Sequence, residues 1–198
     1  METRSGTQAE RLFADLCNRR FLRGFVFHSP RCFNPTESEV GDVVLWVRRK
    51  VVTFEVIAKV ADKTGTKQFV KRIGQKRDQL VNDFKIFNDP NLQITMVNEN
   101  AETVAFDKED VNPFRFAGIV IVDCTQRLEK MHYGTIEKTL GIEFPIAFMT
   151  RQDFLDLAEE IDTIPDLVYY LFDRSEFLKA VYPPAPSHFL DLNLRLER

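Results

Sequence analysis

Hydrophobic positions recur every three to four residues in two long stretches of the chain, and this spacing predicts two amphipathic helices. The first spans about Gln8 to Leu22 and the second about Thr66 to Phe87. Thr7 and Glu10 have the spacing of a capping box at the start of the first helix. The run Asn88-Asp89-Pro90 predicts the end of the second helix.

Runs of β-branched residues predict strands between and after these helices. A hairpin is predicted from Val43 to Val47 and from Val51 to Ala58, joined by the basic turn Arg48-Arg49-Lys50. Further strands are predicted at Phe25–Phe27, Leu92–Val97, Phe116–Val122 and Phe144–Phe148. The near-continuous apolar run Gly118–Val122 fits a central strand that is covered on both faces. The segment from His28 to Glu39 is rich in Ser, Pro and Asn and predicts a loop.

Two shorter helices are predicted near the C-terminus, at about Gln152 to Ile161 and Pro165 to Leu178. Thr150 and Asp153 again have capping-box spacing at the start of the first of them. The order of helices and strands predicts an α/β (α+β) fold, a mixed central sheet flanked by helices. We expect a core at residues 1–150, with residues 151–198 as a C-terminal helical extension packed on it.

The composition is that of an ordinary globular protein. The 198 residues suit one domain, and 44% of them are hydrophobic and 29% charged. No run of eighteen apolar residues predicts a membrane span, and METRSGTQAERLF has no apolar segment of a secretory signal. Cys17, Cys32 and Cys124 are widely spaced, which favours reduced, buried thiols. We therefore expect a cytoplasmic protein with no membrane partner.

Charge is distributed unevenly along the chain, although the net charge is only −3. Between Val43 and Arg77 there are ten basic residues and two acidic ones. Between Arg151 and Arg174 there are seven acidic residues and two basic ones. The basic segment suggests a polyanionic partner, although a solvated helix face is the commoner explanation of such a run.

Two acidic residues stand out in the predicted hairpin. Asp42 precedes its first strand, and Glu55 interrupts the apolar second strand between Phe54 and Val56. Alternation places Glu55 on the same strand face as Ile57 and Lys59. Charges near a sheet interior are costly unless they pair or bind an ion, and Mg²⁺ commonly takes one or two carboxylates. A divalent-cation site is one explanation; a structural ion pair of Glu55 with Lys59 or Arg48 is the other.

This layout resembles the PD-(D/E)xK nuclease superfamily, which includes many restriction endonucleases and repair nucleases. The matching residues are Glu10 on the first helix, Asp42 in GDVVLW and Glu55 in VVTFEVIAK, with Gln79 in RDQLVNDF as a candidate on the next helix. The resemblance implies a restriction-endonuclease-like core and Mg²⁺- or Mn²⁺-dependent hydrolysis of phosphodiesters, in DNA rather than RNA. It implies Asp42, Glu55 and the Val56 carbonyl as metal ligands.

The chain departs from this pattern at one position, because Ile57 stands where the family has its lysine. Ile57 cannot donate to a phosphate or stabilise developing negative charge. Either Lys59 replaces the missing lysine from two positions along the same strand face, or the chain has kept the fold and lost the chemistry. In the second case it would be a protein- or nucleic-acid-interaction module of a defence or repair assembly.

The sequence thus predicts a set of catalytic residues and a set of residues that contact nucleic-acid phosphates. Asp42, Glu55, Lys59, Glu10 and Gln79 form the candidate catalytic set, although Glu10 would serve equally as part of the helix cap. The candidate contacts to nucleic-acid phosphates are Lys63, Lys67, Lys71, Arg72 and Lys76. A homodimer or a larger assembly is compatible with these expectations.

Overall fold

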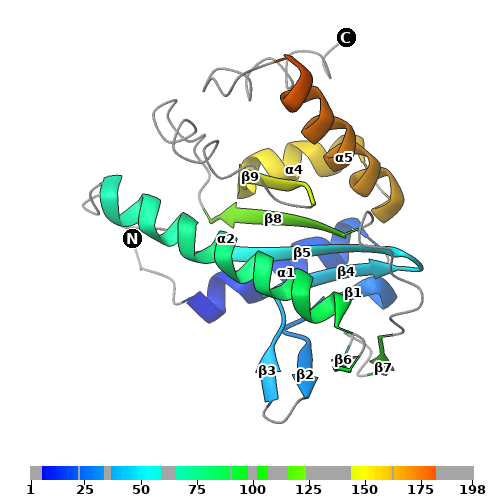
Figure 1. The fold of residues 1–198 in the computed structure, drawn as a ribbon. Helices are drawn as coiled ribbons and strands as arrows, with labels where there is room; N and C mark the ends of the chain where they lie inside the picture. Colours follow the sequence, from blue (N-terminus) through cyan, green and yellow to red (C-terminus); the bar gives the residue numbers. More distant parts are fainter. Residues whose placement is uncertain are drawn as a thin grey trace.

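The computed structural model describes residues 6–21, 23–33, 37–58, 66–89, 91–97, 102–106, 116–123, 144–161 and 163–181. This part of the chain has a mixed α/β fold, in which helices lie on both faces of a central sheet (Figure 1). The predicted fold class is therefore confirmed. The helices are α1 (Gly6–Arg20), α2 (Thr66–Asn88), α4 (Arg151–Glu160) and α5 (Ile164–Val181), with a short 3₁₀ helix at Arg23–Phe25.

The central sheet contains five strands in the order β1-β4-β5-β8-β9. These are β1 (Val26–His28), β4 (Val43–Val47), β5 (Lys50–Ile57), β8 (Phe116–Val122) and β9 (Ile146–Thr150). The first three are antiparallel neighbours, whereas β8 and β9 run parallel to β5. Every residue of β8 is buried, which confirms the prediction of a central strand covered on both faces.

A second sheet lies below the first in Figure 1 and has the order β3-β2-β6-β7. Its strands are β2 (Arg31–Phe33), β3 (Glu37–Glu39), β6 (Gln93–Val97) and β7 (Thr103–Ala105). The loop predicted from His28 to Glu39 is therefore wrong in part, because β2 and β3 form a hairpin there. Pairing of β2 with β6 stabilises these short strands, and a local pattern of turn residues carries no signal of that partner.

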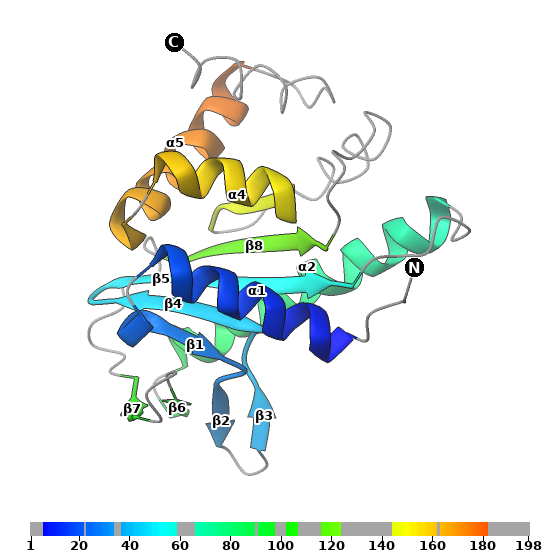
Figure 2. The ribbon, with the colours of Figure 1, turned by 180° about the vertical axis from the view of Figure 1, so that it is seen from behind.

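The two faces of the central sheet bury different cores. Helices α1, α4 and α5 cover one face, where Phe13, Phe54 and Phe154 lie in one apolar cluster (Figure 2). Helix α2 and the second sheet cover the other face, where Leu80 and Phe116 belong to a separate cluster. Residues of α4 and α5 share the cluster of α1, so these helices pack directly on the sheet.

Most predicted helix limits agree with the observed ones, with differences at the N-terminus. Helix α1 begins at Gly6, so Thr7 lies inside it and not at its cap. Thr150 caps α4 as predicted: its side chain accepts from the Asp153 N–H, and the Asp153 side chain accepts from the Thr150 N–H. Cys17 and Cys32 are buried in different clusters, whereas Cys124 lies outside the described residues.

Candidate active site

The candidate site lies at the end of the central sheet where β4 begins and β5 ends. Gly41 leads into it with a φ of +75°, and a Cβ added there would lie 2.4 Å from the Thr53 Cγ2 atom. Glycine is therefore required for the chain to turn this tightly against β5. The Asp42 N–H then donates to the Phe54 carbonyl at 3.0 Å, and the Asp42 carbonyl accepts from the Ser29 N–H at 3.0 Å. The backbone of Asp42 is thus held between two chain segments.

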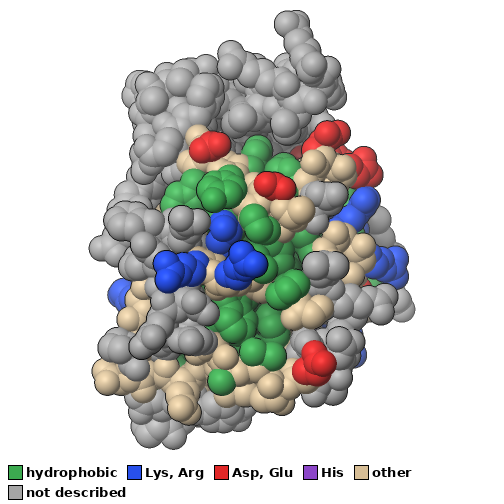
Figure 3. Space-filling model, turned by 90° about the vertical axis from the view of Figure 1, so that its right-hand side faces the viewer, with side chains coloured by type: hydrophobic (Ala, Val, Ile, Leu, Met, Phe, Trp, Pro, Cys, Tyr) green, Lys and Arg blue, Asp and Glu red, His purple; other side chains and the backbone are tan. Residues whose placement is uncertain are grey.

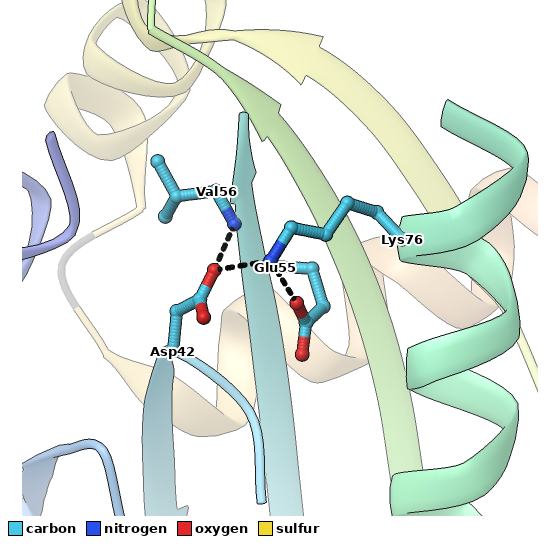
Figure 4. A network of polar contacts seen from close by, with 4 residues as sticks. All are labelled: Asp42, Glu55, Val56 and Lys76. Carbon is cyan, nitrogen blue, oxygen red and sulfur yellow. Dashed lines mark hydrogen bonds and ion pairs between the residues drawn. The ribbon is translucent and has the colours of Figure 1, made fainter. Parts of the chain in front are cut away.

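Asp42 and Glu55 point to the same side of the sheet, toward α2 (Figure 4). Neighbouring residues of β5 alternate as predicted, because Phe54 and Val56 lie in the cluster under α1. The Asp42 Oδ2 atom accepts a hydrogen bond of 2.6 Å from the Val56 N–H. N–H and C=O of one strand residue point to the same neighbouring strand. The Val56 carbonyl is therefore directed to the side of β5 on which Asp42 lies.

Lys76 of α2 joins the two carboxylates. Its Nζ atom lies 3.0 Å from the Asp42 Oδ2 atom and 2.6 Å from the Glu55 Oε2 atom. One cation thus contacts one oxygen of each acid, so these oxygens come within reach of a single ion (Figure 4). The side chains of Asp42, Glu55 and Lys76 are 10%, 3% and 20% exposed, which leaves an opening to solvent mainly along the lysine.

A close approach of α2 to the sheet places this lysine. Gly118 of β8 has no side chain, and a Cβ there would lie 3.0 Å from the Leu80 Cδ1 atom of α2. Leu80 therefore packs almost against the backbone of β8. Lys76 lies one helical turn before Leu80 and on the same face of the helix, which brings its side chain over the ends of β4 and β5.

Burial and a neighbouring like charge raise the proton affinity of Glu55. Desolvation, followed by the charge of Asp42, raises the pKa of Glu55 to about 7, although Lys76 acts in the opposite direction. Burial lowers the pKa of Lys76, but the charges of Glu55 and Asp42 outweigh it and raise the pKa overall. The lysine is therefore a cation at neutral pH and compensates part of the negative charge.

Asp83 is a fourth polar residue of this site that sequence reasoning missed. It lies seven residues after Lys76 on α2, is 3% exposed and shares a side-chain hydrogen bond with Glu55. Burial and the neighbouring charge of Glu55 raise its pKa to about 9. Among the described residues, none forms a hydrogen bond with its Oδ2 atom. An acid beside Phe84, on the apolar face of an amphipathic helix, is the signal that could have revealed it.

No direct contact with Asp42, Glu55 or Lys76 is described for the other predicted catalytic residues. Glu10 is half-buried on α1, and its pKa is raised by burial and then by the charge of Asp42, which indicates electrostatic proximity. Gln79 is exposed on α2, although it lies close in sequence to Lys76. Lys59 lies outside the described residues, so its predicted role as the substitute lysine stays a prediction. Ile57 is 4% exposed and packs in the cluster under α2.

The five predicted phosphate contacts do not share one environment. Lys71 and Arg72 are exposed on α2, as a phosphate contact requires. Lys76 instead makes the internal ion pairs described above. Lys63 lies outside the described residues, and the structure describes the backbone of Lys67 but not its side chain.

The donor atoms at this site suit a hard divalent cation. Mg²⁺ binds through one or two carboxylates and keeps several waters, and Asp42 and Glu55 supply two carboxylates beside the Val56 carbonyl. The described residues contain no group of three or more His, Cys, Asp or Glu side chains arranged to hold a metal. The protein would thus contribute only two side-chain ligands, and water or a substrate phosphate would complete the coordination.

Comparisons with protein-family models, with curated proteins and with solved structures each found no match. A search of the described helices for one that is long and apolar enough to cross a membrane also found none.

Proposed function

We propose that this chain is a metal-dependent nuclease that hydrolyses phosphodiester bonds in DNA. The supporting observation is the convergence of Asp42 and Glu55, from adjacent strands, on a single cationic nitrogen at 3.0 and 2.6 Å. The resemblance of Glu10, Asp42 and Glu55 to the PD-(D/E)xK pattern supports the same reaction. A bound divalent ion would supply an activated water and stabilise the leaving oxygen.

The protein's own residues would divide the remaining tasks. Asp42 and Glu55 would hold the cation, with the Val56 carbonyl as a further ligand. Lys76 would take the role of the family's lysine from α2, since its ammonium already lies beside both carboxylates. A positive charge there would orient the scissile phosphate and stabilise the negative charge that develops on it. Lys71 and Arg72, exposed on α2, would bind neighbouring phosphates and make affinity fall with salt.

The direct test is nicking of supercoiled plasmid in the presence of Mg²⁺ or Mn²⁺. Asp42→Asn keeps the shape of the side chain but removes its charge, and we expect cleavage to fall by at least about 100-fold. Asp15→Asn, an exposed acid on α1, is the matched control and should cleave at the native rate. Equal cleavage by the native chain and Asp42→Asn would contradict the proposed site.

The role of Lys76 can be separated from that of the acids by moving the positive charge. Lys76→Met should remove cleavage, whereas Lys85→Met, at an exposed position near the end of the same helix, should retain it. Ile57 belongs to the α2-facing side of β5, so Ile57→Lys in the Lys76→Met background should restore part of the cleavage. If Lys76→Met cleaved DNA at the native rate, Lys76 would not be the catalytic lysine. Lys59 would then be the candidate for that role.

A second candidate is a non-catalytic interaction module with the same fold, acting in a defence or repair assembly. It is favoured by the ammonium of Lys76, which already compensates the two carboxylates. The described residues also contain no group of three or more His, Cys, Asp or Glu side chains arranged to hold a metal. Such a module would bind DNA, or a protein, without cleaving DNA. Absence of nicking with either metal, together with retained binding of a fluorescent DNA duplex, would favour this candidate.

A further inference from the structure

The end of the molecule opposite the candidate site carries a basic turn. Arg48 and Arg49, both exposed, connect β4 to β5, and Lys50 is the first residue of β5. Arg48 has a φ of +50°, a conformation that few non-glycine residues adopt, and its carbonyl accepts a hydrogen bond of 2.7 Å from the Trp46 Nε1–H group. The turn is thus fixed by an aromatic side chain from its own strand.

Helix α5 lies beside this basic turn, and the two together form one larger surface. The Lys50 Nζ atom lies 5.2 Å from the ring centroid of Tyr169, within the range of a cation–π interaction. Tyr169 is nevertheless 52% exposed, and Phe25 at the same end of the sheet is 36% exposed. Figure 3 shows hydrophobic side chains across this face, with Lys and Arg side chains gathered beside them and most of the visible Asp and Glu side chains in the upper part.

The acidic part of this face follows from the helical repeat of α5. Asp166, Tyr169 and Asp173 are all exposed and lie three and four residues apart, so they form one stripe along the helix. One face therefore presents an acidic stripe, an exposed aromatic centre and a basic turn. A polyanion would be attracted by the turn but repelled by both aspartates, which argues against a nucleic acid as the partner.

We propose that this face, defined by Arg48, Arg49, Tyr169 and Asp173, binds a second copy of the same chain around a two-fold axis. An isologous interface must be complementary to itself, so that each patch on one subunit meets its counterpart on the other. A two-fold axis midway between the basic turn and Asp173 brings the basic turn of one copy to Asp173 of its partner, twice. The aromatic centres of the two copies then cover each other. This interface is independent of the proposed nuclease activity.

The test is the mass of the full chain in solution, measured by light scattering on a sizing column over a range of concentrations. We expect twice the chain mass of 23.1 kDa for the native protein. Arg49→Asp and Asp173→Arg should each give a monomer, because each places like charges opposite one another twice. Lys71→Asp, at an exposed position on α2, is the control and should remain dimeric.

Mixing the two charge variants gives the sharpest outcome. In a mixed dimer of Arg49→Asp and Asp173→Arg chains, one contact pairs the two substituted residues and the other pairs the two native ones. Both contacts therefore join opposite charges. The 1:1 mixture should recover the dimer mass that each variant alone has lost. A native monomer at all concentrations, dimers of both single variants, or a mixture that stays monomeric would each overturn the proposal.

Discussion

Phe54 and Glu55 are neighbours on β5, and they show how one strand serves two different regions. Phe54 points toward α1 and α4, where its ring lies 5.0 Å from that of Phe13 and 5.4 Å from that of Phe154. Glu55 points toward α2, where it contacts Lys76 and Asp83. Both side chains are almost completely buried. The apolar side gains free energy from burial, whereas the polar side is tolerated only because its charges are paired.

The contrast separates residues that stabilise the fold from residues that serve the site. A buried acid whose pKa is raised costs stability at neutral pH, and such costs are typical of functional positions. Substitutions on the two sides of β5 should therefore have opposite consequences. On the aromatic side they should lower stability and leave the chemistry of folded molecules unchanged, and on the polar side they should change the chemistry first.

The largest expected loss of stability comes from Phe154→Ala. The Phe154 ring is fully buried and contacts the rings of Phe13, Phe21 and Phe54. Removing it leaves a cavity between α4 and β5 and should lower the free energy of unfolding by about 3–5 kcal/mol. Urea titration followed by circular dichroism measures this change, with Phe25→Ala, at a half-exposed ring, as the control. A loss below about 1 kcal/mol would mean that the helices close over the cavity.

The sequence predicted the aromatic side of this comparison well because burial leaves a periodic signal. The spacing of apolar residues in α1 and α2, the continuous run of β8 and the alternation of β5 each follow from which side chains leave water. The hairpin of β2 and β3 was missed because three-residue strands carry too short a pattern. The other pairing partner of β2 is β6, which is about 60 residues away in the chain, beyond any local signal.

The candidate site was predictable only in part. Asp42 and Glu55 were predicted because an acid is anomalous in an apolar strand, and strand pairing then fixes their separation. The position of Lys76 depends on the packing of α2 against Gly118, and this tertiary contact cannot be read from helical periodicity. A lysine among many on a basic helix looks like a surface residue. Its two carboxylate partners distinguish it only once the fold is known.

A smaller loss of stability is expected from Lys76→Met, which leaves the two acids without their cation. Loss of one member of a buried ion pair costs about 3–5 kcal/mol, and the partial exposure of Lys76 reduces this to about 2 kcal/mol. The loss should be greater at pH 8 than at pH 5, because Glu55 can take up a proton in acid and become neutral. Thermal denaturation at the two pH values measures this loss, and Lys85→Met, at an exposed position of α2, is again the control. An equal loss at both pH values would mean that Lys76 acts by packing alone.

The smallest expected effect has the opposite sign and comes from Asp83→Asn. The folded chain holds the Asp83 proton up to a pKa of about 9, whereas the unfolded chain releases it near the ordinary value of 3.8. The folded state therefore binds more protons between these values, and the contribution of Asp83 to the free energy of unfolding falls as pH rises. Asn cannot ionise but keeps the shape of the carboxylic acid and can still donate to Glu55.

The difference in stability between Asp83→Asn and the native chain should therefore grow with pH. We expect near equality at pH 4 and a gain for the variant that increases steadily up to pH 8, from urea titrations at a series of pH values. The variant should retain some pH dependence up to about pH 7, because Glu55 still titrates there. Asp15→Asn, an exposed acid on α1, should follow the native curve throughout. A constant difference across the series would mean that Asp83 is ionised in the folded protein, and that Lys76 compensates three negative charges.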